Sequence, residues 1–412
     1  MDRRSSASLR VNFTATFAGN ALFAASQWAV LSLIAKLGSG EMLGQYALAL
    51  AVATPVALFA HLNLRAVLAT DIRKTHPFGD YLALRLATSV AGIAVIAGIV
   101  LVSGYTGSVA AVIVLLGFTL TIDNVSDIYY GLLQRRERMD RIAYSMAARG
   151  LLSVTGLAVT LWLTGSLPAA VAALACGRLA VLFAYDRPTA SAGESLARTG
   201  WGTEAGIFRN ALPLGVVLML VSLTVNLPRY MIEGRLGTVE LGAFAAVASF
   251  MTVGSTVVNA LGQAATPRLA RYFTEHDLRS FRRLAWKLAG LGMVLGAAGV
   301  LAALVLGRFV LALVYRPAYA AYDYLLVWVM AASVFSYLSG ILGYVVTSTR
   351  SFAAQVPLSA VAAGSSALAS WLLVPRLGLA GAALALAAAW TVQMGGQLIV
   401  LDRALRKREF AL

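Results

Sequence analysis

Long apolar runs recur along nearly the whole chain of 412 residues. Each run holds about 20 residues, the length that an α-helix needs to cross the hydrocarbon core of a bilayer. Backbone groups in lipid must be satisfied within the segment or around a closed barrel, and runs this long and apolar predict helices. Twelve spans are predicted, at approximately residues 13–35, 43–64, 82–103, 108–130, 142–164, 167–184, 211–232, 240–262, 284–306, 323–347, 354–375 and 379–401.

Composition agrees with a polytopic membrane protein. Hydrophobic residues make up 59% of the chain and charged residues 12%, and the mean hydropathy is +0.78. These values exclude a soluble globular domain. The net charge of +15 is explained by basic residues that set the orientation in the membrane and attract anionic lipid headgroups. No nucleic-acid partner is therefore expected.

The positions of Lys and Arg between the spans predict the orientation. With the N-terminus inside, the outer side and the adjoining span ends hold only six of the 33 basic residues. These six are Lys36, Arg229, Arg235, Arg308, Arg316 and Arg376. Because basic residues are enriched in cytoplasmic loops, both termini are predicted to be cytoplasmic.

A short Gly-rich turn occurs twice, about half the chain apart. Residues 36–50 (KLGSGEMLGQYALAL) and 235–247 (RLGTVELGAFAAV) share the order of basic, Gly, Glu, Leu-Gly and aromatic residues. At this offset Gln27 and Asn226 fall at equivalent places upstream, and both are candidate polar residues of a cavity between the two halves. The repeat predicts an all-α protein of two six-helix lobes, related by a parallel repeat around a central cavity.

The longest inner connection lies where a linker between two such lobes belongs, and it mixes Pro, Ser, Gly, Thr and charged residues. The predicted lobes are residues 1–190 and 209–412, joined by a cytoplasmic linker over residues 191–208.

Motifs for enzyme chemistry are missing from the sequence. None of the four lysines follows a glycine, so there is no GxxxxGK phosphate loop. There is no GxSxG nucleophile elbow, and the three histidines are too scattered for HExxH. No catalytic residue, cofactor or metal site is predicted.

Arginines inside the spans are candidate functional residues, because a charge in lipid is costly. Arg178 lies eleven residues into the sixth span, about 16 Å deep at 1.5 Å per residue, and Arg149 lies about two turns into the fifth. Arg178 either binds an anion in a wet cavity or pairs with a buried acid, and Arg149 is a candidate for the same cavity. Arg65 and Arg85 lie near the inner interface, where snorkelling to water is expected.

Two carboxylates, Asp123 and Asp127, lie four residues apart in the fourth span and so share one helix face. They either carry a coupling proton or pair with Arg149 or Arg178 to hold the bundle together. In the seventh span, Asn226 and Arg229 flank a proline, which indicates either a gating bend or an interfacial anchor.

Four segments, in their order along a chain of twelve spans, resemble the Wzx-type bacterial polysaccharide biosynthesis flippases of the multidrug/oligosaccharidyl-lipid/polysaccharide exporter superfamily. They are residues 43–56 (LGQYALALAVATPV), 61–71 (HLNLRAVLATD), 126–135 (SDIYYGLLQR) and 375–383 (PRLGLAGAA). The resemblance implies two lobes around a cationic cavity that holds the diphosphate of an isoprenoid-linked sugar. The cationic candidates for this role are Arg65, Arg149, Arg178 and Arg229.

The expected function is therefore to flip undecaprenyl-diphosphate-linked oligosaccharide from the cytoplasmic to the outer leaflet of the bacterial inner membrane. This function serves the synthesis of surface polysaccharide such as O-antigen or exopolysaccharide, with glycosyltransferases and a polysaccharide polymerase as partners. One alternative is a multidrug and toxic compound extrusion antiporter, which needs carboxylates such as Asp123 and Asp127 facing the cavity. A membrane glycosyltransferase or polymerase is disfavoured, because the longest outer loop, residues 307–322, contains no acid.

Overall fold

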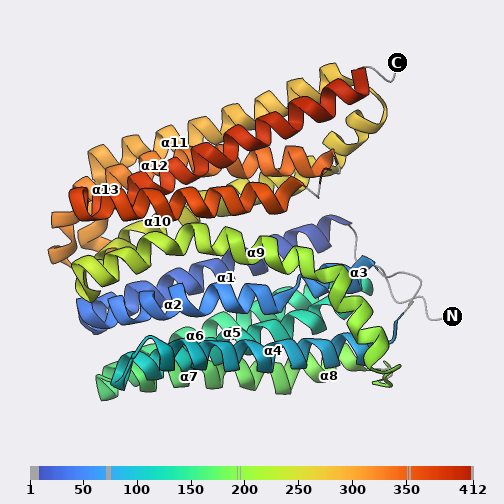
Figure 1. The fold of residues 1–412 in the computed structure, drawn as a ribbon. Coiled ribbons are helices and arrows are strands. Elements are labelled where there is room, and N and C mark those ends of the chain that lie inside the picture. Colours follow the sequence, from blue (N-terminus) through green and yellow to red (C-terminus); the bar gives the residue numbers. More distant parts are fainter. Residues whose placement is uncertain are drawn as a thin grey trace. The chain divides into compact units, whose positions relative to one another are not determined.

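The structure is a computed structural model that describes residues 9–70, 76–192, 194, 196–349, 351 and 354–409. All regular elements within these ranges are helical, which confirms the all-α prediction (Figure 1). The chain divides into two compact units, Met1–Met219 and Leu220–Leu412, and the division falls inside one long helix, α9 (Trp201–Leu236). The lobe boundaries given above stay a prediction.

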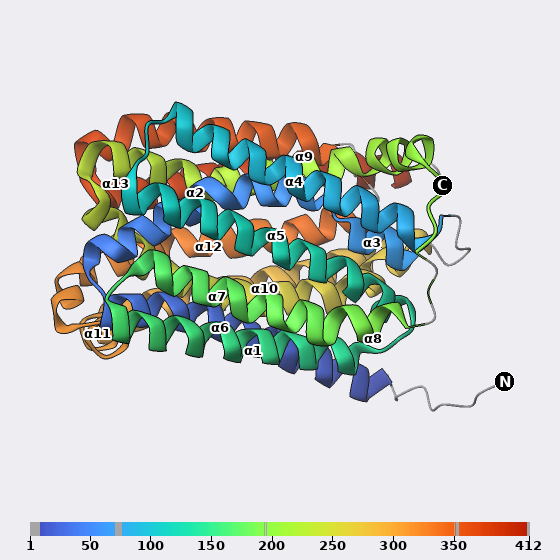
Figure 2. The same cartoon turned by 90° about the horizontal axis from the view of Figure 1, so that it is seen from below.

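The first unit is built around α5 (Gly107–Arg135), which packs against α2, α3, α4 and α7 (Figure 2). Helix α6 packs against α1 on one side and α7 on the other. The other elements are α1 (Leu9–Leu37), α2 (Gly40–His61), α3 (Leu64–Thr70), α4 (Phe78–Val102), α6 (Met139–Thr164), α7 (Leu167–Val181), the π-helix η1 (Leu182–Asp186), α8 (Arg187–Ser191) and the first half of α9.

In the second unit α12 (Asp323–Ser348) is central and contacts α10, α11 and α13. The other elements are the second half of α9, α10 (Thr238–Thr274), α11 (Leu278–Val314), the 3-10 helix η2 (Pro317–Tyr322) and α13 (Gln355–Glu409). Helix α13 contains one residue with non-helical backbone angles, Gly378, at φ 59° and ψ −136°. Only glycine adopts such angles readily, and the chain reverses there into two helical arms. Gly381 in the second arm lies directly against the backbone of Leu373 in the first.

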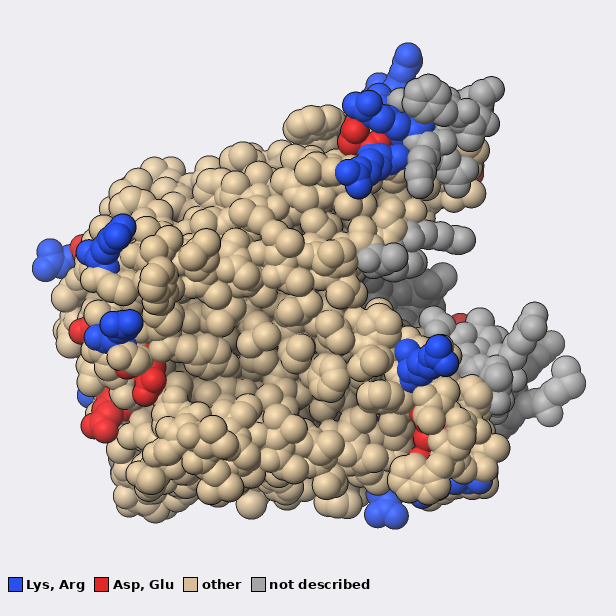
Figure 3. All heavy atoms as spheres, in the orientation of Figure 1, with Lys and Arg blue, Asp and Glu red and all other residues tan. Residues whose placement is uncertain are grey.

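Each of the twelve predicted spans lies mostly within a helix, the last two in the two arms of α13, and the second (43–64) runs past the end of α2 through the turn at Leu62 and Asn63. In the described part of the chain, ten helices are long and apolar enough to cross a membrane, and the chain is a multi-pass membrane protein. The count of twelve crossings stays a prediction. On the face drawn in Figure 3 charged side chains gather near the helix ends, and the surface between carries none.

Both copies of the repeated turn begin a helix. Ser39 caps α2, its side chain accepting a hydrogen bond from the Met42 backbone N–H, and Gly237 caps α10 with φ 98°. In both copies the residues that follow the Leu-Gly pair are buried, including Tyr46 and Phe244. The shared sequence therefore supplies the same element in each unit, a capped helix start followed by a buried helix of small residues.

The predicted linker is partly helical. Residues 193 and 195 lie outside the described residues, and the segment from Trp201 onward forms the first turns of α9. Arg198 pairs with Glu204 at 2.6 Å, which ties the segment before α9 to its first turn. Residue 71, the end of the segment 61–71, also lies outside the described residues.

Candidate functional site

The candidate site of the first unit lies along α5, where Asp123 and Asp127 are separated by one helical turn. Their side chains are 22% and 18% exposed. Both carboxylates are contacted by arginines from neighbouring helices. Asp123 pairs with Arg149 and Arg178, the partners named in the structural alternative, whereas Asp127 pairs with Arg65 instead.

Asp123 joins three helices, because it accepts hydrogen bonds from Arg149 of α6 and Arg178 of α7. Both arginine side chains are only 3% exposed. Their guanidinium carbons lie 5.8 and 5.9 Å from the ring centre of Phe23 on α1, within the range of a cation–π contact. Of the two alternatives for Arg178, the geometry supports a buried partner of an acid.

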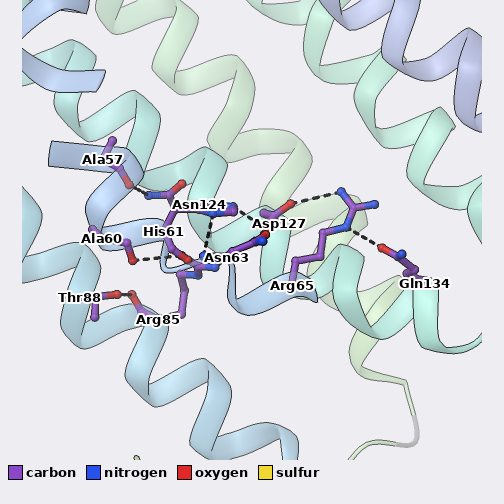
Figure 4. Close-up of polar contacts among 10 residues, drawn as sticks. All are labelled: Ala57, Ala60, His61, Asn63, Arg65, Arg85, Thr88, Asn124, Asp127 and Gln134. Atoms are coloured by element: carbon purple, nitrogen blue, oxygen red, sulfur yellow. Dashed lines mark hydrogen bonds and ion pairs between the residues drawn. The ribbon is translucent and has the colours of Figure 1, made fainter. Parts of the chain in front are cut away.

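Asp127 is held by residues around the end of α2 (Figure 4). His61 Nε2 lies 2.9 Å from one carboxylate oxygen, and Arg65 Nη1 donates to the other at 3.3 Å. The backbone N–H of Asn63 donates to His61 Nδ1 at 3.2 Å, so Nε2 carries the proton that is donated to Asp127. Arg65 also donates through Nε to Gln134 at 2.9 Å, and its side chain is 27% exposed.

Arg85 of α4 contacts both the end of α2 and Asp127. Its side chain is fully buried and donates to the carbonyl oxygens of Ala60 at 3.3 Å and His61 at 2.7 Å. Its Nη2 lies 4.0 Å from Asp127. The snorkelling interpretation of Arg85 is wrong, because the side chain is fully buried and its Nη1 donates to two carbonyl oxygens at the end of α2.

Tyr130 connects the two carboxylate clusters. Its hydroxyl accepts a hydrogen bond from Arg149 Nη1 at 3.0 Å and lies 2.6 Å from Ser145 Oγ, and its ring centre lies 5.7 Å from the guanidinium carbon of Arg65. Ser145 in turn donates to the buried Asp186 at 2.5 Å. Asp186 was not predicted as a site residue because the sixth span was expected to end at residue 184, whereas the helical segment continues through the π-helix η1 and buries Asp186.

The charges along this face of α5 are unequal. Four arginines, Arg65, Arg85, Arg149 and Arg178, surround two carboxylates. Asp186, which accepts a hydrogen bond from Ser145, is a third and buried carboxylate close enough to Arg149 to interact with its charge, although no ion pair joins the two within the described residues. The α5 face therefore carries more guanidinium than carboxylate charge, and Arg65 is the most exposed of the four arginines.

The remaining candidates lie away from α5. Gln27 is half-buried on α1, one turn after Phe23. Arg229 and Asn226 belong to the second unit, where Arg229 Nη1 donates to the Asn226 side-chain oxygen at 3.1 Å. Pro228 does not end α9, which continues to Leu236. In the described residues no group of His, Cys, Asp and Glu has the geometry of a metal site.

A sequence model of the family described as "Polysaccharide biosynthesis protein" matches residues 30–273, more than half of the chain. A capsular polysaccharide biosynthesis protein, CapF of Staphylococcus aureus, is 26% identical over 377 residues, which cover 90% of this chain and 94% of CapF.

Two solved structures share the fold. The lipid II flippase MurJ in an inward closed conformation superposes with a TM-score of 0.75 at 9% identity, covering 97% of this chain and 90% of MurJ. A multidrug resistance MATE family transporter of the MOP superfamily in an inward-facing conformation gives 0.69 at 12% identity, covering 93% and 94%. At these identities the likeness shows the fold, the two-lobe architecture of that superfamily.

Proposed function

Because the chain belongs to the polysaccharide biosynthesis protein family, we propose that it flips undecaprenyl-diphosphate-linked oligosaccharide across the bacterial cytoplasmic membrane by alternating access of its two lobes. The direction is from the cytoplasmic to the outer leaflet, and both termini are cytoplasmic. Glycosyltransferases supply the lipid-linked substrate, and a polysaccharide polymerase consumes it.

The excess of guanidinium over carboxylate charge on the α5 face carries this proposal. Arginine presents a planar fork of N–H donors that suits phosphate oxygens. Arg65 is the first contact for the diphosphate, since its side chain is 27% exposed and its charge is shared with a single carboxylate. Arg149 and Arg178 contribute positive charge from behind Asp123 and hold that carboxylate in place.

The same charge balance favours an anionic cargo over the cationic drugs expected of a multidrug antiporter. A cationic ligand near α5 would meet four arginines, and the two partly exposed carboxylates, Asp123 and Asp127, are already paired. The carboxylates Asp123 and Asp127 are thus proposed to be structural.

The test is flipping of a fluorescently labelled undecaprenyl-diphosphate oligosaccharide in proteoliposomes, measured as the fraction that a membrane-impermeant reductant quenches. Arg65→Ala is expected to lower the rate at least tenfold, and Arg65→Lys to restore part of it. Arg138→Ala is the matched control, because Arg138 is 45% exposed and pairs only with Asp140 among the described residues. Equal rates for Arg65→Ala and Arg138→Ala would reject the assignment of Arg65, and no flipping by the wild-type protein would reject the function.

A further inference from the structure

A cavity of about 440 Å³ lies within the second unit, between α9, α10, α12 and the second arm of α13. This volume falls in the range of about 300–1,000 Å³ that is typical of small-molecule sites. Its polar lining includes Arg229, Asn259, Trp390, Gln393 and Gln397.

Three buried polar atoms in this lining have no hydrogen-bond partner among the residues that the structure describes. They are Arg229 Nε, Trp390 Nε1 and Gln393 Oε1. Buried polar groups in native proteins are nearly always satisfied, and each unsatisfied group costs free energy. Two donors and one acceptor that line one cavity are therefore available to a ligand.

The charge of the cavity lining determines whether a cationic or an anionic ligand is favoured. Arg229 is the single charged residue in the lining, and among the described residues no carboxylate pairs with it. Its only described side-chain partner is the neutral amide of Asn226. A buried cation without a counter-charge favours an anionic ligand.

The other lining residues have chemistry that suits a sugar better than a diphosphate. Gln393 Oε1 needs a donor, which a sugar hydroxyl supplies and an ionised diphosphate does not. Trp390, Tyr337 and Phe244 also line the cavity, and aromatic side chains of this kind pack against the apolar C–H face of a pyranose ring. Ser255 and Thr252 add further hydroxyl groups.

We propose that the cavity of the second unit binds an acidic sugar, with Arg229 facing the carboxylate, Trp390 donating to a ring or hydroxyl oxygen, and Gln393 accepting from a hydroxyl. The proposal rests on the proposed function for the source of this sugar, the glycan of the lipid-linked substrate. On this proposal the second unit recognises the sugar residues of the substrate.

Binding of soluble sugars to the purified full chain in lipid nanodiscs tests this site without requiring transport. Three probes are compared by calorimetry: a disaccharide containing glucuronic acid, its neutral glucose counterpart and inorganic pyrophosphate. The acidic disaccharide is expected to bind at least tenfold more tightly than the neutral one, and pyrophosphate is not expected to displace it.

Variants locate the binding in the cavity. Arg229→Gln is expected to weaken binding of the acidic disaccharide at least tenfold, and Arg235→Gln, an exposed position on the same helix, is expected to change it less than twofold. Gln393→Glu places a carboxylate in the same cavity and is expected to abolish the preference for the acidic sugar. Trp390→Phe keeps the ring without its N–H donor and is expected to weaken binding severalfold, which gives a second test if Arg229→Gln does not fold.

Each other outcome overturns the proposal. Equal affinity for the acidic and neutral disaccharides removes the role of Arg229. Displacement by pyrophosphate makes the cavity a phosphate site, and no saturable binding of either sugar means that the cavity does not read the glycan. Because no flipping is measured, these failures are distinct from a failure of the proposed function in proteoliposomes.

Discussion

Arg178 of α7 and Asp123 of α5 form an ion pair between residues 55 positions apart in the chain. The guanidinium is buried and the carboxylate is partly exposed, so Asp123 lies on the outer side of the pair. An anion that approaches this face meets Asp123 before it meets Arg178. The pair therefore fixes helix positions and supplies charge, and it presents no open fork of donors.

Removing the shared carboxylate is expected to destabilise the first unit. Asp123→Asn leaves Arg149 and Arg178 buried without a counter-charge, and breaking a buried pair in this way costs about 3–5 kcal/mol. Asp140→Asn breaks an ion pair whose two side chains are 44–45% exposed, and such pairs contribute about 0–1 kcal/mol. Thermal unfolding in detergent measures both, and similar midpoints for the two variants would contradict the structural role of Asp123.

Arg178→Ala is expected to lower the unfolding midpoint and the amount of protein in the membrane together with flipping. The truncation leaves Asp123 with Arg149 alone and removes the contact of Arg178 Nε with Ser153 Oγ at 3.4 Å. Arg178→Lys retains the charge and is expected to recover part of the stability. Normal abundance and stability with complete loss of flipping would instead show that Arg178 contacts the substrate.

The pairing of the fourth-span carboxylates could be predicted from sequence, because residues four apart share a helix face and deep arginines were available. Arg149 and Arg178 were named as partners and both contact Asp123, but the partners of Asp127 could not be predicted. The chain turns after α2 through Leu62 and Asn63, both at positive φ, and the Asn63 N–H there donates to His61 Nδ1 while Nε2 contacts Asp127; hydropathy does not encode that turn. Arg85 is buried for the same reason, since the turn brings the carbonyls of Ala60 and His61 around it.

The spans themselves were the most predictable feature, because burial in lipid imposes both their length and their composition. Sequence also located the repeated capped turn of Ser39 and Gly237. It missed the short helix α3 and the π-helix η1, which are too short to produce a hydropathy signal. The buried polar atoms without hydrogen-bond partners in the second-unit cavity could not be predicted either, because they result from the packing of four helical segments.

Asp127→Asn is expected to strengthen binding of anions at Arg65. The carboxylate competes with a phosphate for the Arg65 guanidinium, whose Nη1 lies 3.3 Å from it, and an amide keeps the shape without the charge. Calorimetric titration of pyrophosphate into the nanodisc-embedded protein is expected to give a severalfold lower Kd for the variant than for the wild type. A carboxylate that carries a coupling proton predicts a different result, unchanged affinity with loss of the pH dependence of flipping.

The reversal inside α13 gives a prediction that is independent of any ligand. Gly381 lies against the backbone of Leu373, so the Cβ of Gly381→Ala would collide with the Leu373 carbonyl group. A backbone carbonyl cannot avoid the clash by a side-chain rotation. The two arms would have to separate, and overpacking of this kind costs about 1–3 kcal/mol. Gly395→Ala, on the same arm, meets no atom within 4 Å and replaces a poor helix former with the best one, a gain of up to about 1 kcal/mol. Unfolding midpoints of the two variants are expected to move in opposite directions from the wild type. If the unfolding midpoint of Gly381→Ala equals that of the wild type, the two arms do not pack as closely as the hairpin at Gly378 requires. The second arm could then move and displace the cavity-lining residues Trp390 and Gln393.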